Sequence, residues 1–546
     1  MLVPFIPLLA ILINVWIKDR YKVAKVSVYA SGITFLLSLF FLITYAIKPE
    51  PRKLSLIPPF EFYFDALSAV MLTAVSGISF VVHKYSVKYL QEEEGYKRFF
   101  VLLDLITVAL LMLVSADNML LFLFSWNTVG VLLYLLLNHN YRRKEAVKYN
   151  LWTLVIHKLG DIPLFLALGI LFTKLGTLSL SESFSRLGEI SSETFLLEGV
   201  ALLVVLSAFM KSAQIPFHLW LPYTMEGPTP VSALMHAGIV NAGGFLINRF
   251  APVFYYADLS FHLAFLVGLL TAVLGSILML AQSDIKKALG YSTVGQMGYM
   301  IMEAGVGAFA LAIYHLIAHG IFKATLFMNS GSIIHQARKD TNIPKDEIYS
   351  YLAKGSLPPR RLPWLVFAVI TVVVPLVIVV FAHLFVSEDF FQFQGAIVLL
   401  FFGWITGAQV IFSTYRHAIY SVAKLLLFTV ISFSVVILGY VVIGHSFEAF
   451  LYPDKEFVRK LYQNAQINEL LFDLQVIALA LIIAGGWFLA YYASENKEKL
   501  SPLYQRYYEK LYKLLYEEVY FPRLYKGLGR LFNYLSERLN ALTRWL

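Results

Sequence analysis

The chain has 546 residues, of which 59% are hydrophobic and 14% are charged, and its mean hydropathy is +0.69. These values exclude a soluble domain of this length and indicate a polytopic membrane protein. The net charge of +9 is typical of cytoplasmic loops that contact anionic lipid, so we expect membrane lipid as a partner and no nucleic acid. The absence of cysteine excludes a disulfide framework and a thiolate metal site in this chain.

Apolar runs of about 20 residues recur along the chain between short polar breaks, and each is long enough for one transmembrane helix. They predict an all-α membrane protein with about fifteen spans. The first run follows Met1 directly, and we interpret it as a membrane anchor and not as a cleavable signal. The predicted spans are 2–17, 26–47, 60–82, 99–115, 117–137, 151–173, 195–214, 228–248, 261–282, 287–305, 307–335, 362–386, 394–414, 423–444 and 473–493.

Basic residues are distributed unequally between the two sets of loops. The loops after odd-numbered spans carry ~22 Lys and Arg, against ~9 in the other loops, and the positive-inside rule assigns the richer set to the cytoplasm. We therefore expect the N-terminus outside and the C-terminus in the cytoplasm. The polar tail, 497–546, has leucines at steps of three and four from Leu524 to Leu546. This stripe predicts an amphipathic helix that lies on the inner leaflet or docks a cytoplasmic partner.

The run from Phe195 ends in a lysine and is followed by a proline. Lys211 lies near the end of this run, and Pro216 must break or kink a helix that continues past it. A second apolar run follows Pro228 and carries His236 at membrane depth. Ionisable residues are expensive in hydrocarbon, and broken helices expose backbone groups that need protein or water. The pattern predicts the cation pathway of a transporter or pump.

The predicted span 307–335 carries three more ionisable residues on one helical face. His315, His319 and Lys323 follow one another at steps of four. A single buried histidine is more often a satisfied core residue, but three such groups on one stripe favour proton or cation transfer. Polar Ser292, Thr293 and Gln296 of the preceding span can line a wet path or bond between helices.

A third set of polar residues precedes the lysine run. Lys158 and Asp161 are three residues apart and can pair, with His157 beside them on another face. The pair either stabilises an embedded helix or biases the protonation of Lys211. Asp104 lies alone in an apolar run, and its role is left open. Phosphate-binding loops, nucleophile elbows and metal-ligand clusters do not stand out, so we expect no catalytic residue and no cofactor in this chain.

Three motifs resemble a known family. KSAQIPFHLWLPYTMEGPTPVSALMHA (211–237), SDIKKALGYSTVGQMGYM (283–300) and HGIFKATLFMNSGSII (319–334) are similar to the antiporter-like membrane subunits of respiratory complex I (the NuoL type), Mrp antiporters and DAB inorganic carbon transporters. The resemblance implies two inverted five-helix repeats, each with a broken helix, and proton conduction through buried Lys and His. By motif, Lys211, His236 and Lys323 match the conducting residues and Asp161 matches the aspartate of a GD motif. The implied division is N-terminal helices 1–98, repeats 99–250 and 251–422, C-terminal helices 423–496 and the tail 497–546.

Two departures from this family distinguish its branches. Complex I and Mrp subunits have a glutamate in a WEGVG motif that pairs with the broken-helix lysine, whereas this chain has Asn127, so the usual pair cannot form. Those pumping subunits also have a lysine in the twelfth span, whereas this chain has only His383, with Glu388 and Asp389 beyond it.

By contrast, HAGIVNAGGFL (236–246) followed by Arg249 and Ala251-Pro252 is similar to the DabB-type branch. That resemblance implies an inner-membrane subunit that conducts H⁺ or Na⁺ and is not itself an enzyme. Its implied partner is a large cytoplasmic DabA-type zinc protein resembling β-carbonic anhydrases, which would hydrate CO₂ to bicarbonate. The alternatives are a pumping subunit of a complex I, hydrogenase or Mrp assembly, and a non-conducting anchor for the partner.

Overall fold

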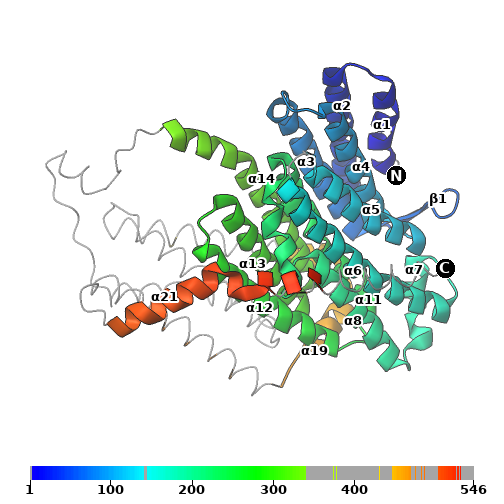
Figure 1. Ribbon diagram of the computed structural model, residues 1–546. Coiled ribbons are helices and arrows are strands. Elements are labelled where there is room, and N and C mark those ends of the chain that lie inside the picture. The colour runs from blue at the N-terminus through cyan, green and yellow to red at the C-terminus, as the bar shows by residue number, and fades with distance from the viewer. Residues whose placement is uncertain are drawn as a thin grey trace, which may run out of the picture.

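The computed structural model describes residues 3–139, 144–339, 445–468 and, except 524 and 528, 502–530, together with a few isolated positions. Within these ranges the chain is a bundle of long helices (Figure 1). Nine helical stretches of the described residues are long and apolar enough to cross a membrane. The predicted spans 362–386, 394–414, 423–444 and 473–493, and the tail beyond 530, lie outside the described residues.

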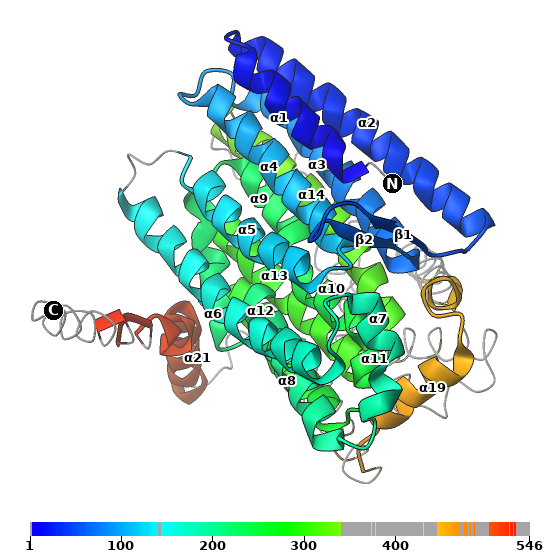
Figure 2. The ribbon, with the colours of Figure 1, turned by 90° about the vertical axis from the view of Figure 1, so that its right-hand side faces the viewer.

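The helices of the bundle run along one another in alternating directions, joined mostly by short loops (Figures 1 and 2). The α-helices are α1 Ile6–Trp16, α2 Arg20–Ile47, α3 Ala66–Tyr89, α4 Tyr96–Ser115, α5 Met119–Leu137, α6 Lys144–Leu175, α7 Leu180–Ser185, α8 Thr194–Lys211, α9 Thr229–Leu234, α10 Ala242–Arg249, α11 Ala251–Phe254, α12 Leu259–Ala281, α13 Ile285–Gly305, α14 Phe309–Lys339, α19 Lys455–Asn464 and α21 Pro502–Tyr516. The short elements are the 3₁₀ helices η1 Val3–Phe5, η2 Leu187–Ile190, η3 Phe217–Trp220, η4 Pro222–Glu226 and η8 Glu518–Tyr520, the π-helix η5 Met235–Ile239, and the strands β1 Arg52–Ser55 and β2 Glu61–Phe64.

Helix starts follow from local chemistry. Asp19, Asp65, Asn118 and Asp284 each precede a helix, and each side chain accepts a hydrogen bond from a backbone N–H of the first turn. Such caps satisfy donors that a helix leaves unpaired at its N-terminus. The polar residue in the break therefore determines where each of these four helices begins.

The predicted start of the third span needs a correction. The apolar run was expected to be helical from residue 60, but 61–64 form β2, which pairs antiparallel with β1. Residues Phe62 and Phe64 are each 1% exposed while their neighbours are partly exposed, and this alternation is typical of a strand with one buried face. The helix begins only at Ala66, after the Asp65 cap.

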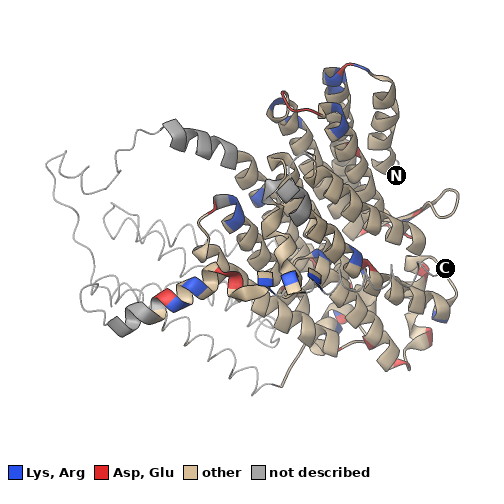
Figure 3. Cartoon of the chain, viewed as in Figure 1, with Lys and Arg blue, Asp and Glu red and all other residues tan. Residues whose placement is uncertain are grey.

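The two ends of the bundle differ. One end, which we call the strand face, carries β1, β2 and α7 and receives α19 (Figure 2). The other end, which we call the tail face, receives the C-terminal segment that follows α21, through contacts with Tyr223 and Lys287. Charged side chains gather on loops and on α21, while the helix bodies are largely uncharged (Figure 3).

Helix α13 is too polar to be among the nine apolar stretches, yet it occupies the predicted span 287–305. It packs closely on α12, since a Cβ added to Gly275 would lie 2.6 Å from the backbone nitrogen of Gly295. Small residues at such a contact let two membrane helices approach closely. This packing keeps the polar side chains of α13 inside the bundle.

The predicted helix break is an irregular segment of the chain. Helix α8 ends at Lys211, and two 3₁₀ turns, η3 and η4, precede α9. The helix expected over 228–248 is itself interrupted by the π-helix η5. Ser212 braces the two irregular segments, because its Oγ donates to Val240 O (2.6 Å) and accepts from Gly243 N (3.0 Å).

Candidate ion pathway

Lys211 is the last residue of α8, and its side chain is 2% exposed. Its Nζ lies 3.3 Å from Asp161 Oδ1 of α6 and donates to Trp126 O of α5 at 3.2 Å. The same ammonium lies 4.9 Å from the centre of the Trp126 ring. A carboxylate, a carbonyl and an aromatic face together compensate the charge for its lost hydration.

Asp161 is shared between two lysines. The pair expected from sequence spacing forms, with Lys158 Nζ 3.5 Å from Asp161 Oδ2. Asn127 Nδ2 donates to the same oxygen at 2.9 Å. The substitution of Asn127 for the family's glutamate therefore does not leave Lys211 without a carboxylate, because Asp161 takes that place.

His157 lies beside this group, fully buried against Trp220 with the ring centres 4.6 Å apart. A Cβ added to Gly130 would lie 3.2 Å from His157 Nδ1 and 3.3 Å from Lys211 Nζ. The glycine thus keeps the space between the imidazole and the ammonium free of a side chain. Neither ring nitrogen of His157 has a hydrogen-bond partner among the described residues.

A second group lies on α13, α14 and η5. His236, in the π-helix, is 1% exposed and stacks on Phe327 of α14 at 4.3 Å. Lys323 is 1% exposed, and its Nζ donates to Ser292 Oγ (2.8 Å) and Leu289 O (3.4 Å) of α13. Among the described residues no carboxylate pairs with Lys323, so its charge is compensated only by neutral oxygens.

The two histidines of α14 differ in their partners. His315 Nδ1 lies 3.0 and 3.1 Å from the two carboxylate oxygens of Glu303, and its Nε2 lies 3.0 Å from Gln296 Oε1. Both ring nitrogens of His315 therefore face oxygen acceptors, and an N–H on either nitrogen has a hydrogen-bond partner. His319, 6.1 Å away between ring centres, has no hydrogen-bond partner among the described residues.

Glu303 was missed by the sequence analysis. It is 5% exposed near the end of α13. The rule that singled out the other groups, an ionisable residue inside a predicted span, applies to it equally.

The described hydrogen bonds do not join the polar residues around Lys211 to those around Lys323. In the described part of the chain the two groups are linked through the backbone, by the irregular segment after α8 and the π-helix η5.

Asp104 belongs to a different cluster. It lies 3.1 Å from His83 Nε2, accepts from Ser27 Oγ (2.6 Å) and contacts Asn14 Nδ2 (3.5 Å), and all four residues are fully buried. Its carboxylate is therefore occupied by α1, α2 and α3, and it is Asp161 that replaces the missing glutamate. His83, one residue past the predicted span 60–82, was not singled out from the sequence. His383, Glu388 and Asp389 lie outside the described residues.

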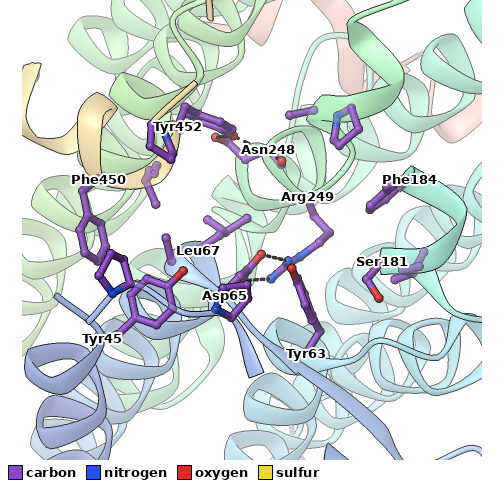
Figure 4. Close-up of a pocket in the computed structure, with 18 of the residues that line it drawn as sticks. Tyr45, Tyr63, Asp65, Leu67, Ser181, Phe184, Asn248, Arg249, Phe450 and Tyr452 are labelled. Carbon is purple, nitrogen blue, oxygen red and sulfur yellow. Dashed lines mark hydrogen bonds and ion pairs between the residues drawn. The ribbon is translucent and has the colours of Figure 1, made fainter. Parts of the chain in front are cut away.

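The strand face contains a cavity of about 590 Å³. At its wall Arg249 pairs with Asp65 at 2.6 Å (Figure 4). Arg249 also donates to Ser68 Oγ and Val114 O. This ion pair was also missed, although Asp65 lies inside the predicted span 60–82 and Arg249 directly follows the predicted span 228–248. Burial raises the pKa of Tyr63, which lines the same cavity, above its usual value. Lys211 and Lys323 do not line this cavity.

The chain is similar to known families of membrane subunits. Residues 116–411 match a family profile described as NADH:quinone oxidoreductase/Mrp antiporter, TM, and residues 55–100 match the chain 5 N-terminus of NADH-ubiquinone oxidoreductase (complex I). A probable inorganic carbon transporter subunit, DabB1, of Halothiobacillus neapolitanus is 46% identical over all of this chain and 99% of that protein. NADH-quinone oxidoreductase subunit L of Rickettsia felis is 40% identical over 50% of this chain, which spans 44% of that subunit.

Two solved structures share the fold. A structure of the Mrp complex from Dietzia sp. aligns with a TM-score of 0.59 at 24% identity, covering 98% of this chain and 59% of that one. The membrane-bound sulfane sulfur reductase, an archaeal respiratory complex, aligns with a TM-score of 0.54 at 15% identity, covering 90% of this chain and 96% of that one. At these identities the likeness concerns the fold alone.

Proposed function

The chain belongs to the NADH:quinone oxidoreductase/Mrp antiporter family of membrane subunits, in its DabB-type branch, and on this premise we propose that it conducts H⁺ or Na⁺ in an inorganic carbon uptake complex. The residues that carry the cation are Lys211, His236, His315, His319 and Lys323, with Lys158, Asp161, Asn127 and His157 supporting the first lysine.

The observation that carries the proposal is the burial of two lysines inside membrane-spanning helices. Lys211 and Lys323 are 2% and 1% exposed and lie at the break and along α14. Even by the lowest estimates, a lysine at the centre of a membrane helix costs about 2.5–3.5 kcal/mol, so such residues are rare and usually functional. The irregular backbone of η3, η4 and η5 supports the same reading, since it is tolerated in membranes where protein or a cavity satisfies it.

The orientation follows from the basic loops. The tail face faces the cytoplasm in this proposal and the strand face lies outside, with the C-terminal tail on the cytoplasmic side. The cation enters near the strand face and leaves toward the tail face. This direction allows the membrane potential to drive inward flow.

The partner in this proposal is a large cytoplasmic DabA-type zinc protein that hydrates CO₂ to bicarbonate, while this chain supplies no catalytic residue. Hydration of CO₂ releases a proton. Coupling the hydration step to inward cation flow makes hydration effectively one-way. One elementary charge that crosses 100 mV supplies about 2.3 kcal/mol, nearly two powers of ten in an equilibrium constant.

The test uses cells that depend on inorganic carbon uptake. Lys211→Ala and Lys323→Ala are each expected to abolish uptake while the complex still assembles. Lys174→Ala is the matched control, because Lys174 is 40% exposed and pairs with Glu193 away from both groups. Intact uptake in both assembled variants would leave only the role of a membrane anchor.

A pumping subunit of a complex I-, hydrogenase- or Mrp-type assembly is the second candidate. The Lys211–Asp161 contact favours it, because the lysine keeps a carboxylate partner despite Asn127. Co-purification separates the two candidates. One large zinc protein supports the carbon uptake complex, and a set of other membrane subunits supports the pump.

A further inference from the structure

The segment after α21, residues 518–523 and 525, packs against the irregular segment that follows α8. Tyr525 OH donates to Pro216 O at 2.7 Å, and the Tyr525 ring lies 5.4 Å from the ring of Trp152 of α6. Phe521 packs edge-on against His218 of η3 at 4.9 Å. Burial raises the pKa of Tyr525 well above its usual value, as expected for a hydroxyl removed from water. This part of the tail is therefore a packed component of the bundle.

Glu518 points into the bundle from this segment. Its side chain is 2% exposed, it forms an ion pair with Lys287 of α13, and it accepts a hydrogen bond from Tyr223 OH of η4 at 2.8 Å. Lys287 also lies over the Tyr223 ring, 4.9 Å from its centre. The carboxylate therefore joins η4, next to the break, to the first turn of α13.

The backbone is strained where it turns this carboxylate inward. Glu518, Val519 and Tyr520 have φ values of +56°, +53° and +60°. Three consecutive non-glycine residues in the left-handed region are costly, and such strain persists where surrounding contacts enforce it. The strained backbone thus places the Glu518 carboxylate at the tail-face end of α13, at a cost in conformational energy.

The same helix carries the other polar groups of the second site. From the tail face inward, α13 presents Lys287 to Glu518, Ser292 to Lys323, and Gln296 and Glu303 to His315. Ser292, Gln296 and Glu303 share one face of α13 and form a polar column toward α14, whereas Lys287 lies on another face of the first turn. Glu518 lies beyond the tail-face end of this column and belongs to none of the described membrane helices.

We propose that Glu518 is the residue at which the cation passes between the α13–α14 column and the cytoplasm, so that the C-terminal tail completes the pathway. This inference rests on the proposed conduction and adds a residue to it. The carboxylate receives the cation from the Lys323 end, and Lys287 and Tyr223 hold it in place. If the C-terminal segment had only a structural role, the packing and hydrogen bonding of Glu518 would be required but its negative charge would not.

The experiment separates the charge from the contacts. Glu518→Gln keeps an oxygen that accepts from Tyr223, but it has no negative charge to bind a cation and takes up no proton. The matched control is Glu517→Gln, the adjacent carboxylate, which pairs with exposed Arg523. The natural chain has no cysteine, so the pair Trp152→Cys and Tyr525→Cys, joined by a short dithiol-specific cross-linker, holds the tail in its seat in all variants.

Cation flux is measured in proteoliposomes of the purified complex, under an H⁺ gradient at equal Na⁺ and under a Na⁺ gradient at equal pH. In the cross-linked background we expect Glu518→Gln to lower flux of the conducted ion at least tenfold and Glu517→Gln to change it less than twofold. A third variant, Glu518→Gln with Lys287→Met, removes the unpaired lysine. We expect no recovery of flux in it.

Three results would overturn the inference. These are flux of cross-linked Glu518→Gln within twofold of the cross-linked reference, equal losses in Glu517→Gln and Glu518→Gln, and recovery of flux in the Lys287→Met double variant, which would reveal a purely structural ion pair. Each of them leaves the proposed function standing as long as the unsubstituted complex conducts. A complex that conducts neither ion would refute the proposed function, and the inference with it.

Discussion

The two buried lysines are held in opposite ways. Lys211 lies against the carboxylate of Asp161, which Lys158 and Asn127 hold in place. Lys323 bonds only to Ser292 Oγ and Leu289 O among the described residues, with His319 one turn before it. Burying an ammonium costs less where a carboxylate lies beside it than where only neutral oxygens do. The two sites therefore differ in how the charge of the lysine is compensated, by a carboxylate at Lys211 and by neutral oxygens at Lys323.

The largest expected effect is that of Asp161→Asn, which removes the carboxylate from beside Lys211. Breaking a buried ion pair by removing one partner costs about 3–5 kcal/mol, and we expect about 3 here because Asp161 is slightly exposed. Tryptophan fluorescence on heating should show a clear fall in the unfolding temperature, and cation flux should be lost. Asp258→Asn, at an exposed position, is the control. An unchanged unfolding temperature would contradict the view that Asp161 compensates the charge of Lys211.

The sharpest test of the comparison is to replace each lysine by methionine. In Lys323→Met no carboxylate of the described residues loses a partner, so we expect the free energy of unfolding to stay the same or rise by up to about 2 kcal/mol. In Lys211→Met, Asp161 loses one of its two lysines, and we expect a fall of about 1–2 kcal/mol. Both variants should lose cation flux. Equal falls in stability would show that the two sites do not differ as described.

A smaller effect is expected for Glu303→Gln, which removes the carboxylate from His315. The ring then faces an amide in place of two carboxylate oxygens, and we expect a loss of about 1 kcal/mol in stability and roughly tenfold in flux. Measuring both at several pH values shows whether the loss follows the protonation of a histidine. Glu182→Gln, at an exposed position of helix α7, provides the matched control. Flux equal to that of the unsubstituted chain would remove His315 from the pathway.

The smallest effect concerns a histidine outside the spans. Burial and the charge of Arg98 lower the pKa of His139, which packs edge-on against Phe99 at 5.4 Å. Because its folded-state pKa lies below that of the unfolded chain, stability is lost as the pH falls through about 6.5. His139→Phe, which keeps an aromatic ring against Phe99, should reduce the loss of unfolding temperature between pH 7.5 and 5.5. An identical loss in both proteins would place the acid sensitivity at a residue other than His139.

Several features of the site were predictable because they depend on neighbours in the chain. The spacing of Lys158 and Asp161 implied their pairing, and Pro216 implied that the helix carrying Lys211 would not continue. Glu303 was equally visible as an ionisable residue in an apolar span. The partner of Lys211 was not predictable in this way, because the sequence shows that Asn127 is not a carboxylate but not which carboxylate replaces it.

Composition and apolar periodicity by themselves determined that this is a multi-pass helical membrane protein, since only a bilayer accommodates such runs, and the motifs indicated its family. The tertiary structure alone decided which charges from different helices meet. Asp161 comes to Lys211 from another helix, Asp104 turns to His83, and Glu518 reaches Lys287 across more than two hundred residues. The physical reason is that hydropathy and helical spacing are properties of a single span. Charge compensation in a low-dielectric interior depends instead on distances of a few ångströms between helices that are remote in sequence.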